Sequence, residues 1–206
     1  NVSKTLTISS FEIDTTSPTV REITVVTDPT NDTTPDYTFS SNEAGTITYG
    51  GSCSSNTTSA VASNNTITLK GSSSDELADN TTFSDCTVTV TDSAGNVSSS
   101  ITISSFEVDT TAPSLEEVTP VKNPTNDQTP NYSFSSSQAG TISYGGSCSS
   151  TGNTSAAASD NNTITLNSLN EGTYDNCTIT VTDNASNASV TLNISSFTID
   201  TTAPTV

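Results

Sequence analysis

The residues that could carry chemistry in this chain are mainly oxygen donors. Its 206 residues include 22 Asp and Glu but only four Lys and Arg, and there is no His. Ser and Thr are frequent, yet no base is placed to activate a hydroxyl nucleophile. A carboxylate pair for glycoside hydrolysis stays open, because so many acids permit many pairings. The composition favours a protein that is not an enzyme and needs no organic cofactor.

Several acidic segments are expected to meet at the ends of the folded units and to bind calcium, which prefers carboxylate, amide and carbonyl oxygens. Two other interpretations stay open: Asp and Asn in turns often bond their own backbone, and an acidic surface keeps neighbouring repeats from associating. The predicted ligands are Glu107, Asp109, Asp28, Asn31, Asp32, Asp183 and Asn187 at a central junction, Glu12, Asp14 and Asp92 upstream of it, and Asp200 and Asp127 downstream.

The four cysteines form two pairs at matching places in the two halves of the chain, Cys53 with Cys86 and Cys148 with Cys177. A structural zinc site is the competing interpretation, but the chain has neither a C-x-x-C motif nor a His to complete the ligand set. The spacing therefore favours two disulfides. Disulfides persist in oxidising compartments, so an extracellular location is expected.

The chain repeats itself. The phrases "FEIDTTSP", "FEVDTTAP" and "FTIDTTAP" begin at Phe11, Phe106 and Phe197, and "EAGTITYGGSCSS" returns as "QAGTISYGGSCSS". We therefore predict one repeat over residues 14–108 and a second over 109–199. Residues 1–13 are expected to be the last strand of a preceding repeat, or a donor strand, and residues 200–206 the start of a following repeat. Units of this size each bury a modest core.

Apolar and polar residues alternate in "TITLK", "TVTVTD" and "ITISSFEV", which is typical of half-buried strands. Each repeat contains about seven such segments, separated by turns rich in Pro, Asn, Asp and Gly. This pattern predicts an all-β fold of tandem immunoglobulin-like antiparallel β-sandwiches with one disulfide per domain. The segments at 45–53 and 86–92 are expected to pair antiparallel, and one unbroken strand is expected over 97–108.

Three short motifs resemble those of a known family. The "DTTAP" linkers, the "PTND" segments followed by "TP", and "VTDSAGN" with its counterpart "VTDNASN" are similar to bacterial Ig-like repeats of large secreted adhesins and biofilm proteins. The resemblance covers essentially the whole chain, although a cysteine pair is less usual in that family. It implies repeats that extend a binding tip from a cell surface, many of them stiffened by calcium at their junctions.

The net charge of −18 opposes binding to nucleic acid or to an anionic membrane. No apolar stretch is long enough to insert into a bilayer. We therefore expect a stiff, non-catalytic spacer in the stalk of an extracellular adhesin, with neighbouring repeats of the same chain as its partners. One alternative is a filament subunit in which residues 1–13 complete another copy by donor-strand complementation. A glycan-binding module is the least favoured alternative.

Overall fold

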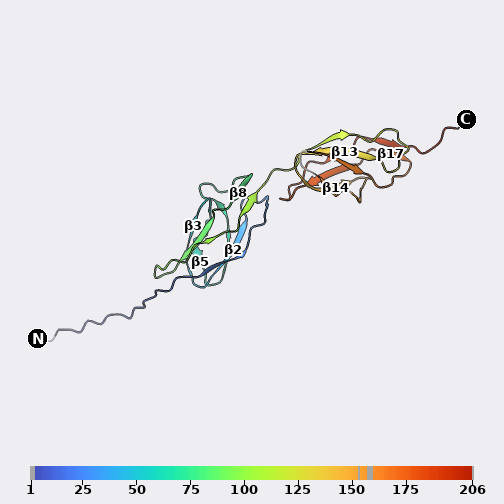
Figure 1. Ribbon diagram of the computed structural model, residues 1–206. Coiled ribbons are helices and arrows are strands. Elements are labelled where there is room, and N and C mark those ends of the chain that lie inside the picture. The colour runs from blue at the N-terminus through green and yellow to red at the C-terminus, as the bar shows by residue number, and fades with distance from the viewer. Residues whose placement is uncertain (1–2, 153, 157–159, 206) are drawn as a thin grey trace. The chain divides into compact units, whose positions relative to one another are not determined.

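The computed structural model describes residues 3–152, 154–156 and 160–205. In these residues all regular structure is β, the sheets are antiparallel, and there is no helix (Figure 1). The predicted all-β class is therefore confirmed. None of the described residues belongs to a helix long and apolar enough to cross a membrane.

The chain separates into two compact units. Unit 1 is the chain up to Asp28 together with Thr33–Glu107, and unit 2 is Pro29–Asp32 together with the chain from Val108 onward. The short loop segment Pro29–Asp32 belongs to unit 2 because Thr30 forms a β-bridge with Val108.

The first repeat folds into a three-stranded sheet, a four-stranded sheet and two strand pairs. The three-stranded sheet has the order β1 (Val20–Thr24), β2 (Asp36–Ser41), β6 (Asn64–Thr68). The four-stranded sheet has the order β10 (Ile101–Thr102), β9 (Thr87–Thr91), β3 (Gly45–Gly50), β5 (Ser59–Ala60). The pairs are β11 (Phe106–Val108) with β8 (Thr81–Phe83), and β4 (Cys53–Ser54) with β7 (Lys70–Gly71).

The second repeat has the same strand order in its sheets. Its three-stranded sheet runs β12 (Leu115–Thr119), β13 (Asn131–Ser136), β16 (Asp160–Thr165). Its four-stranded sheet runs β15 (Ser155–Ala156), β14 (Gly140–Gly145), β18 (Thr178–Thr182), β19 (Leu192–Asn193). A separate pair joins β17 (Gly172–Tyr174) to β20 (Phe197–Ile199).

The core of unit 2 lies between its two larger sheets. Tyr132 and Phe134 from β13 share one buried cluster with Ile142 from β14 and with Ile179 and Val181 from β18. Thr alternates with these apolar residues in β18 and stays partly exposed, as a period of two requires. The fold is therefore β-sandwich-like. The corresponding residues of the first repeat are buried as well: Tyr37, Phe39, Ile47, Val88 and Val90.

On the outer faces of the sheets, Ser and Thr hydroxyl groups on neighbouring strands form hydrogen bonds with each other. Thr38 and Thr66 are register partners in β2 and β6, and their hydroxyl oxygens lie 2.9 Å apart. The corresponding pair in unit 2, Ser133 with Thr163, has a separation of 2.8 Å. Such uncharged cross-strand pairs each stabilise a sheet modestly.

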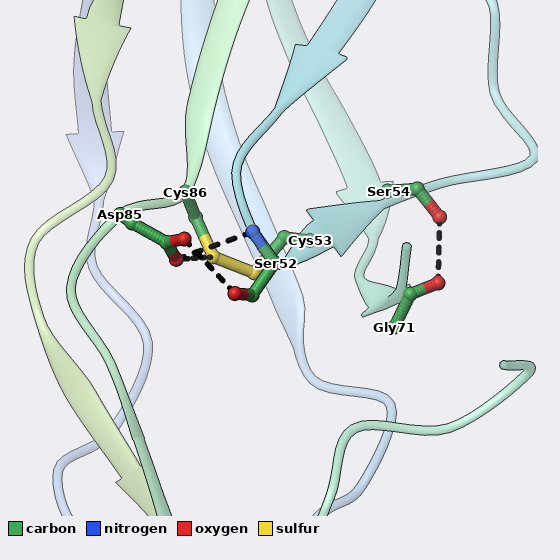
Figure 2. The surroundings of a disulfide bond; sticks show 6 residues. All are labelled: Ser52, Cys53, Ser54, Gly71, Asp85 and Cys86. Atoms are coloured by element: carbon green, nitrogen blue, oxygen red, sulfur yellow. Dashed lines mark hydrogen bonds between the residues drawn. A yellow bond between two sulfur atoms is a disulfide. The ribbon is translucent and has the colours of Figure 1, made fainter. Parts of the chain in front are cut away.

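Both predicted disulfides are present, Cys53–Cys86 and Cys148–Cys177, each with a Cα–Cα distance of 5.2 Å. They suggest an oxidising environment. The predicted antiparallel pairing around them is confirmed, since β3 pairs with β9 and β14 pairs with β18. Figure 2 shows the loop beside the first bridge, where Asp85 accepts hydrogen bonds from Ser52 N at 3.2 Å and Ser52 Oγ at 2.9 Å.

The final strand of each repeat is broken, contrary to the prediction of one strand over 97–108. β10 pairs with β9, whereas β11 pairs with β8, so the chain changes partner between them. At this break Ser104 donates from its N–H (2.9 Å) and its hydroxyl (2.6 Å) to the carboxylate of Glu22. Ser195 and Glu117 repeat both bonds at the same distances in unit 2.

The segment predicted as a donor or last strand, residues 1–13, is described from residue 3 onward, and residues 3–13 form no strand. Its apolar side chains are exposed: Leu6 by 89%, Ile8 by 78%, Phe11 by 76% and Ile13 by 78%. A strand needs a hydrogen-bonded neighbour, and no described strand pairs with this segment.

Candidate functional site

The strongest candidate site is a group of three carboxylates in unit 1, Asp14, Glu43 and Asp92, which we call the acidic triad. One oxygen from each lies within 4.8 Å of the others, and no other group of three His, Cys, Asp or Glu among the described residues is this close. The antiparallel register of β3 and β9 brings the start of one strand to the end of the other, with Thr46 opposite Thr91. Glu43 and Asp92 therefore meet.

Hydrogen bonds fix the two aspartates of the triad. Asp92 Oδ1 accepts from the backbone N–H groups of Ala94 (2.8 Å) and Asn96 (2.9 Å). The Asn96 side-chain amide, together with these backbone groups, holds the pKa of Asp92 below its ordinary value. The same amide donates to Asp14 O at 3.1 Å and to Asp92 Oδ2 at 2.8 Å. Asp92 is therefore ionised at neutral pH and directed toward Asp14.

Unit 2 builds the same arrangement with one charge fewer. Asn187 donates its amide to Asp109 O at 2.8 Å and to Asp183 Oδ2 at 3.0 Å. Gln138 stands where Glu43 stands in the first repeat, and its Nε2 donates to Asp109 Oδ2 at 3.3 Å. The amide oxygen of Gln138, Oε1, is buried and has no hydrogen-bond partner among the described atoms. An amide thus supplies a donor where unit 1 has a third carboxylate.

Other predicted ligands bond the backbone. Asp28 Oδ1 accepts from Glu107 N–H at 2.9 Å, Asp127 Oδ1 from Thr129 N–H at 2.9 Å, and Asp200 Oδ1 from Thr202 N–H at 3.0 Å. The bonds of Asp127 and Asp200, two residues apart in the sequence, match the turn-forming interpretation of the acids, whereas that of Asp28 joins two distant segments. The remaining predicted ligands, Glu12, Asn31, Asp32 and Glu107, are exposed.

The structure unites Asp14 with Asp92, and Asp109 with Asp183 and Asn187, as the sequence predicted for each end. It adds Glu43 and Gln138, which were not among the predicted ligands. Each of them follows the second strand of its repeat and comes directly before the "AGTI" with which the next strand of the same repeat begins. Extending the predicted pairing of residues 45–53 with 86–92 by two positions would have found them.

The triad concentrates negative charge that no described cation neutralises by an ion pair. The ion pair of Lys70 with Asp75, at 3.5 Å, does not involve the triad. Three carboxylates at this separation repel one another when all are ionised, and a hard cation is the ligand that such oxygens favour.

Comparison with known proteins gives no assignment: no family model matches the chain, and no curated protein or solved structure is significantly similar to it. Any function must therefore be argued from the residues of the chain itself.

Proposed function

We propose that the chain is a non-catalytic structural part of an extracellular adhesin stalk. In this proposal it consists of immunoglobulin-like sandwiches, each with one disulfide, that act as a stiff spacer at a cell surface. The supporting observation is an anchor that occurs twice. The amide of Asn96 binds the backbone carbonyl of Asp14, and the amide of Asn187 binds that of Asp109, at 3.1 and 2.8 Å.

The anchored residue begins the "DTT" phrase of each linker, and its conformational freedom is small. Asp109 donates its N–H to Thr30 O at 2.9 Å, and its Oδ1 accepts from Thr111 N–H at 2.9 Å. Pro113 fixes one further backbone angle of the linker. These bonds leave little freedom at Asp109, at the start of the linker, and this supports the proposed stiff spacer.

The disulfides support the same proposal. They close loops with sequence separations of 33 and 29 residues. In the chain-entropy model such loops contribute about 3–4 kcal/mol each. For units with modest cores this is a large part of the free energy of unfolding. Units closed in this way stay folded outside the cell, where chaperones do not repair them.

Within this proposal calcium binds the acidic triad. The carboxylates of Asp14, Glu43 and Asp92 offer clustered oxygen ligands, and Asp14 begins the linker that leads into β1. A cation here would neutralise the triad and hold the start of the linker. In unit 2 the amide of Gln138 already takes that place, so we expect calcium to act on unit 1 alone.

The spacer proposal is tested by cutting the anchor of the linker between the two repeats. Asn187→Ala removes the bond to Asp109 O, whereas the matched control Asn96→Ala removes the equivalent bond to Asp14 O and leaves residues 109–114 untouched. We expect Asn187→Ala to broaden the distance distribution between spin labels placed in the two units, with no change in the control. A wild-type distribution already as broad as that of Asn187→Ala would refute a stiff spacer.

Asn187 also bonds Asp183 within unit 2. The melting temperature of unit 2 is therefore measured for each variant, so that a broader distribution is not confused with unfolding. No contact among the described residues favours a glycan-binding role.

A further inference from the structure

The two repeats differ in length, and the whole difference lies between the two cysteines of each disulfide. Asp14 and Asp109 begin the repeats, and each lies 39 residues ahead of the first cysteine of its own repeat. The second cysteine lies 23 residues ahead of Asp109 in the first repeat and of Asp200 in the second. Only the interval between the bridged cysteines changes, from 33 to 29 residues. Both repeats therefore have 62 residues outside the bridge.

The strands follow the same division. Ahead of the bridge the repeats correspond with a shift of 95 positions, which relates β1, β2 and β3 to β12, β13 and β14. After the bridge the shift is 91 positions, from β9, β10 and β11 to β18, β19 and β20. Between the cysteines the shift changes, since β5 and β15 are 96 positions apart whereas β8 and β17 are 91 apart. The strands outside the bridge thus keep one spacing, and the length difference is confined to the loop.

A pull on the two ends of the first repeat reaches its disulfide through β3 and β9. Thr46 pairs with Thr91 at the end of these strands away from the bridge, and Gly50 pairs with Thr87 at the end beside it. Tension enters at the first of these ends, because the chain arrives at the start of β3 and leaves from the end of β9. The strands therefore separate one pair at a time toward the disulfide, where a covalent bond stops them. β14 and β18 have the same arrangement in the second repeat.

The bridge then transmits the tension from one cysteine directly to the other, over a Cα–Cα distance of 5.2 Å in the folded chain. The residues between the cysteines form a closed loop beside this path, so they are not drawn out. All four cysteines are at most 4% exposed. A dissolved reductant therefore reaches the sulfur atoms only after the repeat has begun to unfold, and in an oxidising environment the bridge persists.

We propose that each disulfide removes its loop from the path of tension, so that every repeat that unfolds lengthens the chain by the same 62 residues. Residues 54–85 and 149–176 can then differ in length without changing how far a repeat extends. This use of the disulfides rests on the spacer proposal, whereas the extension is measured whether or not the linker is stiff. A broad distribution between spin labels would refute the stiff spacer and leave the unfolding lengths as expected, so the two failures are distinguishable.

The test stretches the intact chain between two handles in optical tweezers, without reductant. We expect two unfolding steps of equal contour length, although the repeats have 95 and 91 residues. Replacing Cys53 and Cys86 by Ser should lengthen one step by about 115 Å and leave the other unchanged, at 3.3–3.6 Å per released residue. Replacing Cys148 and Cys177 by Ser should lengthen the other step by about 100 Å. Two wild-type steps of different length overturn the proposal.

Should a unit without its bridge fail to fold, insertions that keep all four cysteines decide. A flexible Gly/Ser insertion of about eight residues between Ser72 and Ser73 lies inside the closed loop, at two exposed positions, and should leave both steps unchanged. The matched control places the same insertion between Ser99 and Ser100, which are exposed and outside any strand. It should lengthen one step by about 28 Å. An insertion at Ser72 that lengthens a step as much as the control overturns the proposal.

Discussion

The side-chain amide of Gln138 donates a hydrogen bond to Asp109 Oδ2 at 3.3 Å, at the place where the first repeat brings Glu43 to Asp14. The chain thus contains two versions of one arrangement that differ by a single charge. In unit 2 the amide of Gln138 donates to one of two carboxylates, whereas in unit 1 Glu43 adds a third carboxylate. Each unit can therefore serve as the control when the effect of the third carboxylate on stability and on calcium response is measured in the other.

Glu43→Gln should stabilise unit 1 in chelator and remove any effect of calcium on it. The amide relieves the repulsion among the three carboxylates, and the gain should be at most about 1 kcal/mol because the triad is partly exposed. Saturating calcium at 100 times its dissociation constant should stabilise wild-type unit 1 by about 2.7 kcal/mol. Thermal melts in millimolar calcium and in chelator measure both effects.

The reciprocal change, Gln138→Glu, should make unit 2 less stable in chelator and newly sensitive to calcium. If the wild-type chain melts at the same temperature with and without calcium, the triad does not bind calcium. The role left for its acids is then turn formation.

Glu117→Gln should destabilise unit 2 by about 1–3 kcal/mol, because the amide offers Ser195 one neutral acceptor oxygen in place of two charged oxygens. The two hydrogen bonds of Ser195 to Glu117, at 2.9 and 2.6 Å, hold the break between β19 and β20 against β12. Glu116→Gln is the matched control, since Glu116 lies next along β12 with its side chain exposed. Denaturant unfolding measures both variants. Equal losses would show that net charge, and not this contact, sets the stability.

The stability of unit 2 should fall above about pH 10, where an unfolded Tyr ionises. Tyr132 is fully buried, and burial followed by the charge of Glu117 raises its pKa. The folded state keeps this proton while the unfolded state releases it. The contribution is therefore fully present below pH 10 and is lost as the pH rises.

Tyr132→Phe should lessen that alkaline loss. The hydroxyl of Tyr132 has no hydrogen-bond partner among the described atoms, so its removal should cost little at pH 7. Urea unfolding at pH 7 and at steps from pH 9 to 11 gives the slope of the free energy of unfolding against pH for the wild type and for the variant. Parallel slopes for wild type and variant would contradict the burial of an un-ionised Tyr132.

Gly146→Ala should destabilise unit 2 by about 1–2 kcal/mol or more. Gly146 has φ of +71°, and a Cβ there would overlap the backbone oxygen of Asn176, next to Cys177. Gly152→Ala is the control, because a Cβ at Gly152 meets nothing within 4 Å. Differential scanning calorimetry compares the two. If Gly152→Ala destabilises unit 2 as much as Gly146→Ala, the positive φ and the close approach at Gly146 are not the cause of the destabilisation.

Local pattern was enough to predict much of the fold. The Thr–Val alternation of residues 87–91 has a period of two, and it forms β9 with Val88 and Val90 buried. The cysteines could be paired because each follows or precedes a recognisable strand. Both inferences depend on neighbours in the sequence or on one strand pairing.

The features that the sequence did not reveal are tertiary. The break at Ser104 requires the carboxylate of Glu22, which lies in a different sheet and far away in the sequence. Glu43 joins the triad through strand register, and nothing in its own segment marks it as a ligand. Residues 3–13 have the pattern of a strand, but no described strand pairs with them and they form none.

The paired hydroxyls on the outer faces affect how the stability of the fold depends on salt concentration. A bond between Thr38 and Thr66, or between Ser133 and Thr163, involves no charge and is therefore not weakened by dissolved ions. The net charge of −18, in contrast, is a repulsion that ions reduce. High salt should consequently leave the cross-strand bonds intact while it reduces the repulsion among the acidic side chains, so the fold should tolerate a wide range of ionic strength.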